Sequence, residues 1–183
     1  MSGSSQSRTK GVTLIAHNFR GYDGYFILKY MLDNNLKPEV IKRGTKLLDL
    51  RYKRLKINAR DTLNFCALKL ANFPKAVGLN HLVSKGEFPH LANRPENWDK
   101  IIDFPKPPDY MIESRTNEEK EKFLKWYKVE RKVCDGKFTF REQIVKYCSM
   151  DVTVLRLCAL KFRSDFIELC QIDPFKSVTI VAA

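Results

Sequence analysis

The feature that most restricts the fold is a long helical stretch near the C-terminus. Apolar residues recur at helical spacing from about Phe140 to Cys170, and Asp173-Pro174 follows. Proline cannot continue a helix because it lacks the backbone N–H and its ring clashes with the preceding turn, so the helix must end before Pro174. Segments with strand periodicity precede this helix. The pattern therefore predicts an α/β fold.

The rest of the chain divides into shorter segments of strand and helix character. Residues 11–16 are an apolar run of strand length, and helical spacing begins after the turn at 17–24. Thr116 and Glu119 have the spacing of a capping box, which marks the start of a helix. The expected elements are, in order, a strand at 11–16, a helix at 25–34, strands at 46–52 and 55–58, helices at 61–70, 116–132 and 140–170, and a strand at 178–181.

Length and composition favour one folded domain. The chain has 183 residues, of which 44% are hydrophobic and 11% aromatic, and this is too apolar for a disordered protein. No window approaches the roughly 20 consecutive apolar residues of a membrane-spanning helix, so no membrane partner is expected. The polar residues 1–10 are expected to be a disordered tail, and residues 11–177 are expected to form the domain.

The charge of the chain predicts an anionic partner. There are 33 Lys and Arg against 21 Asp and Glu, which gives a formal net charge of +12. Nucleic acid is the commonest partner of so basic a domain, and the alternative is a solvated basic surface. The basic residues concentrate in two stretches, 42–60 and 120–132.

The five cysteines do not have the spacing of a metal site or of a disulfide framework. Their number is odd, no C-x-x-C pair exists, and no secretory signal precedes them. We therefore expect buried free thiols in a reducing compartment. His17 and His90 have no partner at ligand spacing and are expected to be structural, and Trp126 and Tyr127 are expected to pack in the core.

Two short segments contain the side chains best suited to chemistry. Residues 16–26 run from a strand into a helix, and Asp23 would lie at the start of that helix, where the backbone dipole favours negative charge. Tyr147 and Asp151 are four residues apart and so share one face of the long helix. A carboxylate with a phenol one turn away can hold a metal ion and orient its attacking water. Each residue also has a structural alternative. Asp23 could only cap its helix, Tyr147 could be a core tyrosine, and Asp151 could be a solvated acid on the helix surface.

These segments resemble the exonuclease motifs of family B DNA polymerases, in the protein-primed branch found in viruses, organelles and large DNA transposons. Asn18-x-x-x-Tyr22-Asp23 is similar to the second exonuclease motif, and Tyr147-x-x-x-Asp151 is similar to the third. The resemblance extends, in the family's order, over about residues 12–181. It includes five further segments, which are Asp61-Thr62-Leu63-Asn64-Phe65, Phe73-Pro74-Lys75-Ala76-Val77-Gly78-Leu79, Lys85-Gly86-Glu87-Phe88-Pro89-His90, Asp173-Pro174-Phe175 and Val178-Thr179-Ile180.

The resemblance implies an RNase-H-like 3′–5′ exonuclease domain with a mixed sheet and flanking helices. It implies that Asp23 and Asp151 would ligate Mg²⁺, that Tyr147 would position the water, and that Lys85 would stabilise charge on the scissile phosphate. The residues that would contact the DNA 3′ end are Asn18, Tyr22, Thr62, Leu63, Phe65 and Phe88.

One part of the family's pattern is missing. The family's site needs two further acids from an upstream Asp-x-Glu motif, and none of the residues before Asn18 is Asp or Glu. The expectation is a truncated exonuclease domain in which 178–183 begins the connection to a polymerase palm. With Asp23 and Asp151 alone, Mg²⁺ binding should be weak or absent, and the isolated chain should have little nuclease activity. The strand at 11–16 should also have an unpaired edge.

Three functions follow from the resemblance and the residues. The first is a fragment of a protein-primed DNA-directed DNA polymerase, which would act on primer–template DNA and deoxynucleotides with a terminal protein as partner. The second is a non-catalytic nucleic-acid-binding remnant of a transposon or virus polymerase. The third is a stand-alone proofreading-type nuclease, which the palm-like exit at Asp173-Pro174-Phe175 disfavours.

Overall fold

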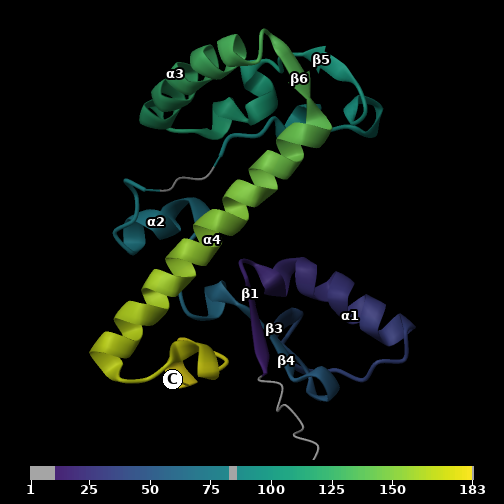
Figure 1. Ribbon diagram of the computed structural model, residues 1–183, viewed down its shortest axis with the longest axis vertical. Helices are drawn as coiled ribbons and strands as arrows, with labels where there is room; N and C mark the ends of the chain where they lie inside the picture. Colours follow the sequence, from purple (N-terminus) through teal and green to yellow (C-terminus); the bar gives the residue numbers. More distant parts are fainter. Residues whose placement is uncertain (1–10, 83–85, 183) are drawn as a thin grey trace, which may run out of the picture. The chain divides into compact units, whose positions relative to one another are not determined.

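The chain folds into two compact units that share one long helix. The computed structural model describes residues 11–82 and 86–182. The sheet unit comprises residues 11–82 and 155–182, and the aromatic unit comprises residues 86–154. The helix α4 (Phe140–Cys170) contributes its first half to the aromatic unit and its second half to the sheet unit (Figure 1). The tail predicted at residues 1–10 lies outside the described residues.

The sheet unit is built on a four-stranded mixed sheet. Its strands lie in the order β1-β4-β3-β2, with β1 parallel to β4 and the other pairs antiparallel. The mixed sheet with flanking helices confirms the predicted α/β class. The strand bounds are β1 (Val12–Ala16), β2 (Glu39–Arg43), β3 (Lys46–Tyr52) and β4 (Ile57–Asp61). As expected, β1 has an edge that no described strand pairs with.

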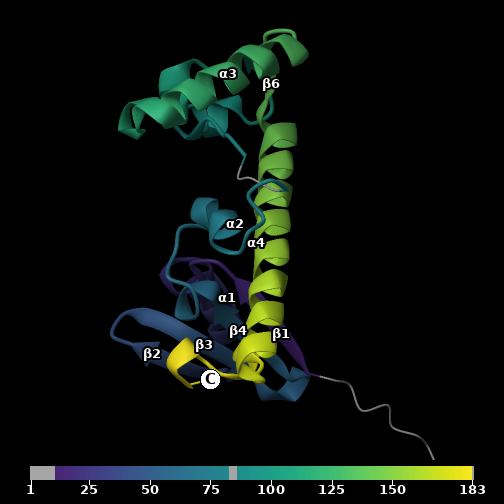
Figure 2. The same ribbon diagram turned by 90° about the vertical axis from the view of Figure 1, so that its left-hand side faces the viewer.

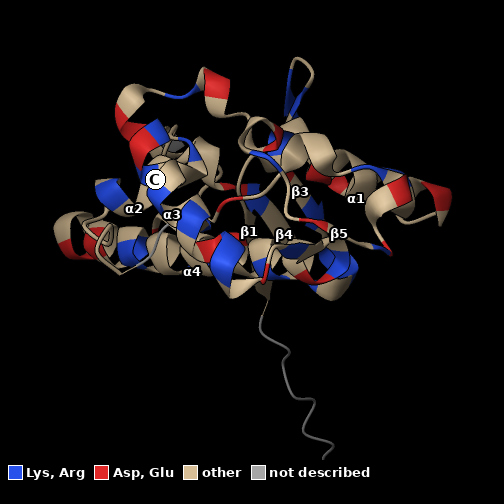
Figure 3. Ribbon diagram, turned by 90° about the horizontal axis from the view of Figure 1, so that it is seen from above, with Lys and Arg blue, Asp and Glu red and all other residues tan. Residues whose placement is uncertain are grey.

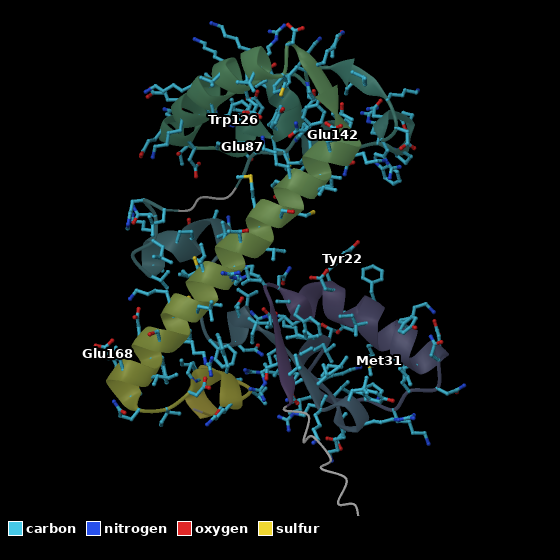
Figure 4. All side chains as sticks on the ribbon, viewed as in Figure 1. Tyr22, Met31, Glu87, Trp126, Glu142 and Glu168 are labelled. Atoms are coloured by element: carbon cyan, nitrogen blue, oxygen red, sulfur yellow. The ribbon has the colours of Figure 1, made fainter. Side chains whose placement is uncertain are left out.

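One face of the sheet packs against the helix α1 (Asp23–Asp33) (Figure 1). Met31 of α1 is buried with Leu47 and Leu50 of β3 and Ala59 of β4, and this cluster is the core of the sheet unit. Met31 points from the helix toward the sheet, whereas Tyr22 projects away from the start of α1 (Figure 4). Burial of these apolar side chains supplies the main driving force for the packing.

A buried charged pair lies within the sheet. Asp49 of β3 and Arg60 of β4 are cross-strand partners, and Arg60 Nε donates to Asp49 Oδ1 at 3.0 Å. Arg51 donates to the second carboxylate oxygen of Asp49, and a guanidinium N–H of Arg60 donates to the backbone carbonyl of Phe175. The charges are therefore compensated, and the pair fastens the C-terminal segment to β4.

The C-terminal segment is held by a second ion pair at its start. Arg163 of α4 donates two hydrogen bonds to the Asp173 carboxylate, at 3.0 and 2.6 Å, and these bonds hold the pKa of Asp173 below its usual range. Phe175 packs against Phe65 and Phe162 at ring-centroid distances of 5.2 and 6.3 Å. The segment consequently lies beside β3 (Figure 2).

The aromatic unit has a core of aromatic rings. It contains a two-stranded antiparallel sheet of β5 (Ile101–Asp103) and β6 (Lys137–Thr139), and the helix α3 (Asn117–Val133). Arg115 forms a bidentate ion pair with Glu87, and its guanidinium carbon lies 4.9 Å from the ring centroid of Phe123. Several ring pairs, such as Phe104–Tyr127 and Phe138–Phe140, pack edge to face, which is an arrangement that aromatic quadrupoles favour. The buried core residues are Phe88, Phe104, Tyr110, Ile112, Phe123, Tyr127, Phe138 and Phe140.

Several predicted elements are confirmed at their bounds. The strand at 46–52 and the helix at 140–170 have the limits that the periodicity predicted. The capping box at the start of α3 is present, with Thr116 and Glu119 each bonded to the other's backbone N–H. Tyr127 is buried in the aromatic core, as expected.

Other predicted elements are wrong. The helix predicted at 61–70 is absent, because Asp61 ends β4 and its side chain caps only a short 3₁₀ helix, Thr62–Asn64. The strand predicted at 55–58 lies at Ile57–Asp61 instead, because Lys53–Leu55 forms a 3₁₀ turn. The strand predicted at 178–181 is a 3₁₀ turn at Ile180–Ala182.

The cysteines also depart from expectation. All five are free, but only Cys158 is buried. Burial raises the pKa of Cys158 and, to the extent that they are covered, those of Cys66 and Cys134. Cys148 and Cys170 are exposed on α4, where a long helix places part of every turn toward solvent.

Replacing the helix cap should weaken the aromatic unit alone. Thr116→Ala removes the hydroxyl that accepts the backbone N–H of Glu119, and the expected loss is about 1 kcal/mol of unfolding free energy. Both tryptophans, Trp98 and Trp126, lie in this unit, so urea unfolding followed by tryptophan fluorescence reports on it. Thr45→Ala, at the β2–β3 turn, is the control and should leave the fluorescence midpoint unchanged. Equal midpoints for the two variants would contradict the assignment.

Candidate nucleic-acid interface

A buried carboxylate joins two of the segments that sequence analysis singled out. Asp61 is fully buried at the end of β4. Its Oδ1 accepts the backbone N–H groups of Asn18 and Leu63, and its Oδ2 accepts that of Arg20, each at 2.9 Å. The turn after β1 and the segment after β4 are therefore held together by one side chain. Charge-assisted bonds of this kind are about twice as strong as neutral ones.

The turn after β1 has a backbone conformation that few residues adopt. Asn18 has φ = 63° and ψ = 28°, in the left-handed region, where asparagine is tolerated better than most side chains. Next to it, His17 Nδ1 lies 2.8 Å from Thr62 Oγ1. His17 thus has the structural role that was expected, and it adds a second link between the two segments.

Tyr22 and Asp23 lie on the surface where this turn enters α1. Tyr22 is 64% exposed, and its ring lies edge-on to that of Phe26 at 4.8 Å between centroids. Asp23 is the first residue of α1 and is exposed. Its carboxylate is stabilised there by the positive end of the helix dipole. Both side chains are accessible to a ligand.

The residues after β4 are mostly covered. Thr62 is 1% exposed, and Phe65 is buried against Phe175. Leu63 is half-buried and lines a surface hollow. Thr62 and Phe65 therefore support the segment by packing beneath it, whereas Leu63 is exposed enough to contact a ligand.

The aromatic unit brings together the predicted segment that contains Phe88 and the predicted segment that contains Tyr147. Phe88 packs on Tyr147 with 5.1 Å between ring centroids, and His90 lies edge-on to the same ring at 5.8 Å. A Cβ on Gly86 would lie 3.1 Å from Met150 Cε, so this glycine allows the close approach. Phe88 is only 3% exposed, which favours a packing role over direct contact with DNA. Asp151, one turn beyond Tyr147, is half-buried, and Lys85 lies outside the described residues.

Neither unit alone contains both predicted metal-ligating acids. Asp23 belongs to the sheet unit, and Asp151 with Tyr147 belongs to the aromatic unit. Over residues 11–82 and 86–182, no group of three or more His, Cys, Asp or Glu side chains is placed to hold a metal ion. A two-metal centre needs several carboxylates to neutralise and hold its ions. The residues within a unit do not fit such a centre.

The sheet unit contains a basic hollow that sequence analysis did not identify. Its volume is about 730 Å³, and Arg20, Arg43 and Lys46 line it beside Leu63 and Asn64. The basic stretch 42–60 was the only available signal. Lysine and arginine occur along the ribbon of both units (Figure 3). Part of the basic stretch is neutralised within the fold, because Arg51 and Arg60 pair with Asp49 and Lys53 pairs with Glu39.

Comparison with known proteins identifies the family. The model of the family described as "DNA polymerase type B, organellar and viral" matches residues 5–182. The chain therefore belongs to the type B DNA polymerases. Within that class, its family is the organellar and viral one.

A curated relative covers part of the chain. A DNA polymerase of Kluyveromyces lactis is 31% identical over 81 residues, which are 43% of this chain and 8% of that polymerase. The aligned part is thus a small fraction of the relative's length. No solved structure matches the chain. Among the described helices, none has the combination of length and apolar composition needed to cross a membrane.

The Asp61 carboxylate should be essential for the sheet unit. In Asp61→Asn, one carboxylate oxygen becomes an NH₂ group that faces backbone N–H donors, which should cost about 3 kcal/mol of unfolding free energy. Urea unfolding followed by far-UV circular dichroism measures the loss. Asp33→Asn is the control, because Asp33 is exposed and among the described residues it pairs only with Lys29, and its cost should be about 0.3 kcal/mol. Similar midpoints for both variants would refute the assigned role.

Proposed function

We propose that this chain is part of the 3′–5′ exonuclease region of a protein-primed type B DNA polymerase, and that it binds the 3′ end of single-stranded DNA. The proposal includes an RNase-H-like ancestry for the sheet unit. The complete polymerase would act on primer–template DNA and deoxynucleotides, with a terminal protein as the source of the priming hydroxyl. The family match over residues 5–182 supports the polymerase assignment.

The observation that carries DNA binding is the link made by Asp61. This side chain bonds both to the turn that bears Asn18 and to the segment that bears Leu63. These are two of the segments that the resemblance assigns to the DNA 3′ end, although they are 43 residues apart in sequence. A shared buried anchor fixes the two segments relative to each other, as a binding site requires.

The chemistry available for binding is sequence-independent. Tyr22 offers an exposed aromatic ring on which an unpaired base can stack. The net charge of +12 attracts the phosphate backbone and makes the affinity dependent on salt. The exposed ring favours a single strand over a duplex, in which the bases are already stacked on each other.

A non-catalytic role of the chain on its own is supported by the small number of acids that the resemblance assigns to the metals. The resemblance assigns one acid in each unit to the metals, Asp23 in the sheet unit and Asp151 in the aromatic unit. A single carboxylate cannot hold two divalent ions, and no group of three or more ligating side chains occurs among the described residues. The chain by itself would hold the strand, and hydrolysis would need further acids.

Tyr22 should contribute to DNA binding through stacking. Tyr22→Ala should weaken binding of a fluorescein-labelled oligo(dT) by about tenfold, measured by anisotropy at fixed salt. Tyr30→Ala is the matched control, because Tyr30 lies on α1, the helix that Tyr22 directly precedes, and is 65% exposed, as Tyr22 is at 64%. The control should change the affinity by less than about twofold. An equal effect of the two substitutions would argue against a base contact at Tyr22.

The isolated chain should release little or no nucleotide in the presence of Mg²⁺. The measurement is the shortening of 5′-labelled single-stranded DNA from its 3′ end, compared between the chain and its Asp151→Ala variant. The two rates should be indistinguishable, because two carboxylates are too few for a two-metal site. Release by the unmodified chain that Asp151→Ala abolishes would overturn the non-catalytic part of the proposal and leave DNA binding to be judged by the Tyr22 experiment.

A further inference from the structure

The basic hollow of the sheet unit has the composition of a site for an anion with an apolar part. Its cationic side chains are Arg20, Arg43 and Lys46, and no acidic residue is among the described residues that line it. Its walls are apolar and include Leu48, Leu63 and Ile180. The volume of about 730 Å³ lies within the roughly 300–1,000 Å³ of small-molecule sites.

The two cations at the β2–β3 hairpin are free to bind a ligand. Arg43 and Lys46 are a cross-strand pair on either side of a two-residue turn. Gly44 allows this turn with φ = 59°, and both basic side chains are exposed. Neither forms an ion pair with any part of the chain that the structure describes. By contrast, Arg20 Nε lies 3.7 Å from Asp61 Oδ2, so its charge is partly compensated.

Asn64, which lines the hollow, has a buried acceptor that lacks a donor. Asn64 is 9% exposed, and its Nδ2 donates to the backbone carbonyl of Leu48 at 2.8 Å. That bond fixes the orientation of the amide. Its Oδ1 is buried and has no hydrogen-bond partner within the described residues. A buried carbonyl oxygen without a hydrogen-bond donor is unfavourable unless a ligand or water supplies one, so Asn64 adds an indication of a ligand to that of the cations.

We propose that the hollow binds one nucleotide unit, with its phosphate at Arg43 and Lys46 and its base among the apolar walls, where a base N–H group donates to Asn64 Oδ1. The cations, the apolar walls and the amide match three features of a nucleotide, which are its anionic phosphate, the flat faces of its base and the hydrogen-bonding edge of that base. The inference rests on the proposed function, since DNA is the source of nucleotide that the function supplies. A free deoxynucleotide has the same chemistry.

The first test removes the phosphate contacts without disturbing the core. Arg43→Gln/Lys46→Gln is compared with Lys37→Gln/Lys75→Gln, which removes the same charge from exposed positions outside the hollow. Binding of dTMP and of fluorescein-labelled oligo(dT) is measured for each by calorimetry and anisotropy. The hollow variant should weaken binding by about tenfold or more, and the control by less than about twofold. Equal weakening by both variants would mean attraction by net charge only and would overturn the proposal.

The second test addresses Asn64 by changing the ligand, so that protein folding is not a concern. N3-methyl-dTMP lacks the only N–H donor of thymine. The chain should bind it about fivefold to tenfold more weakly than dTMP, because Asn64 Oδ1 would stay unpaired. Equal affinities would overturn the assigned base contact.

The two probes identify the source of the nucleotide. An effect of the hollow variant on dTMP and oligo(dT) alike indicates a site for any nucleotide, and an effect on oligo(dT) alone indicates a site that needs the strand. If the hollow variant binds both probes as tightly as the control while Tyr22→Ala weakens oligo(dT), the hollow is not the site and the proposed function stands. If the unmodified chain binds neither probe, both proposals fail.

Discussion

The sheet unit depends on one buried carboxylate. Asp61 ends β4, caps the turn that follows it, and accepts two backbone N–H groups of the turn after β1. A backbone turn that leaves a sheet edge has N–H groups without strand partners, and burying them unpaired would be costly. By accepting three of them, one side chain allows two loops to pack together at the ends of the parallel strands β1 and β4. The position of Asn18, the entry into α1 and the exposure of Tyr22 follow from this arrangement.

The basic side chains of the chain differ in role: some form ion pairs within the fold, and others line a surface hollow. Within the stretch 42–60, Arg51 and Arg60 neutralise the buried Asp49, and Arg60 also holds the C-terminal segment. Arg43 and Lys46 at the hairpin turn are left to face a hollow instead. The net charge therefore overstates the surface available to an anion. At the hairpin, the two cations line the same hollow as the apolar walls and Asn64.

Sequence reasoning succeeded where a pattern is long and local. The 31-residue helix α4 and the capping box of α3 could be placed from spacing alone, because side chains three or four residues apart decide them. It failed at residues 61–70, where helix-forming residues follow Asp61 but its carboxylate is engaged by groups 41 and 43 residues away. The three-residue strands β5 and β6 were missed because three residues are too few to show an alternation.

Only part of the candidate site could be predicted from the sequence, because local motifs are visible there and contacts between distant elements are not. The segments around Asn18 and Tyr147 were found from motifs, but the burial of Thr62 and Phe88 and the free carbonyl of Asn64 arise only when distant elements pack. Whether Arg60 or Lys46 is available to a ligand depends on where Asp49 lies, and a charge count cannot tell these residues apart.

The outer edge of β1 determines which of its backbone amides are open to exchange with water. Along an edge strand, successive backbone amides point alternately toward the neighbouring strand and away from it. The amides directed at β4 are held in the ladder, whereas those directed outward contact solvent or whatever chain lies next to them. Hydrogen–deuterium exchange along Val12–Ala16 would consequently alternate between slow and fast from one residue to the next, and uniform protection would reveal that the edge is covered.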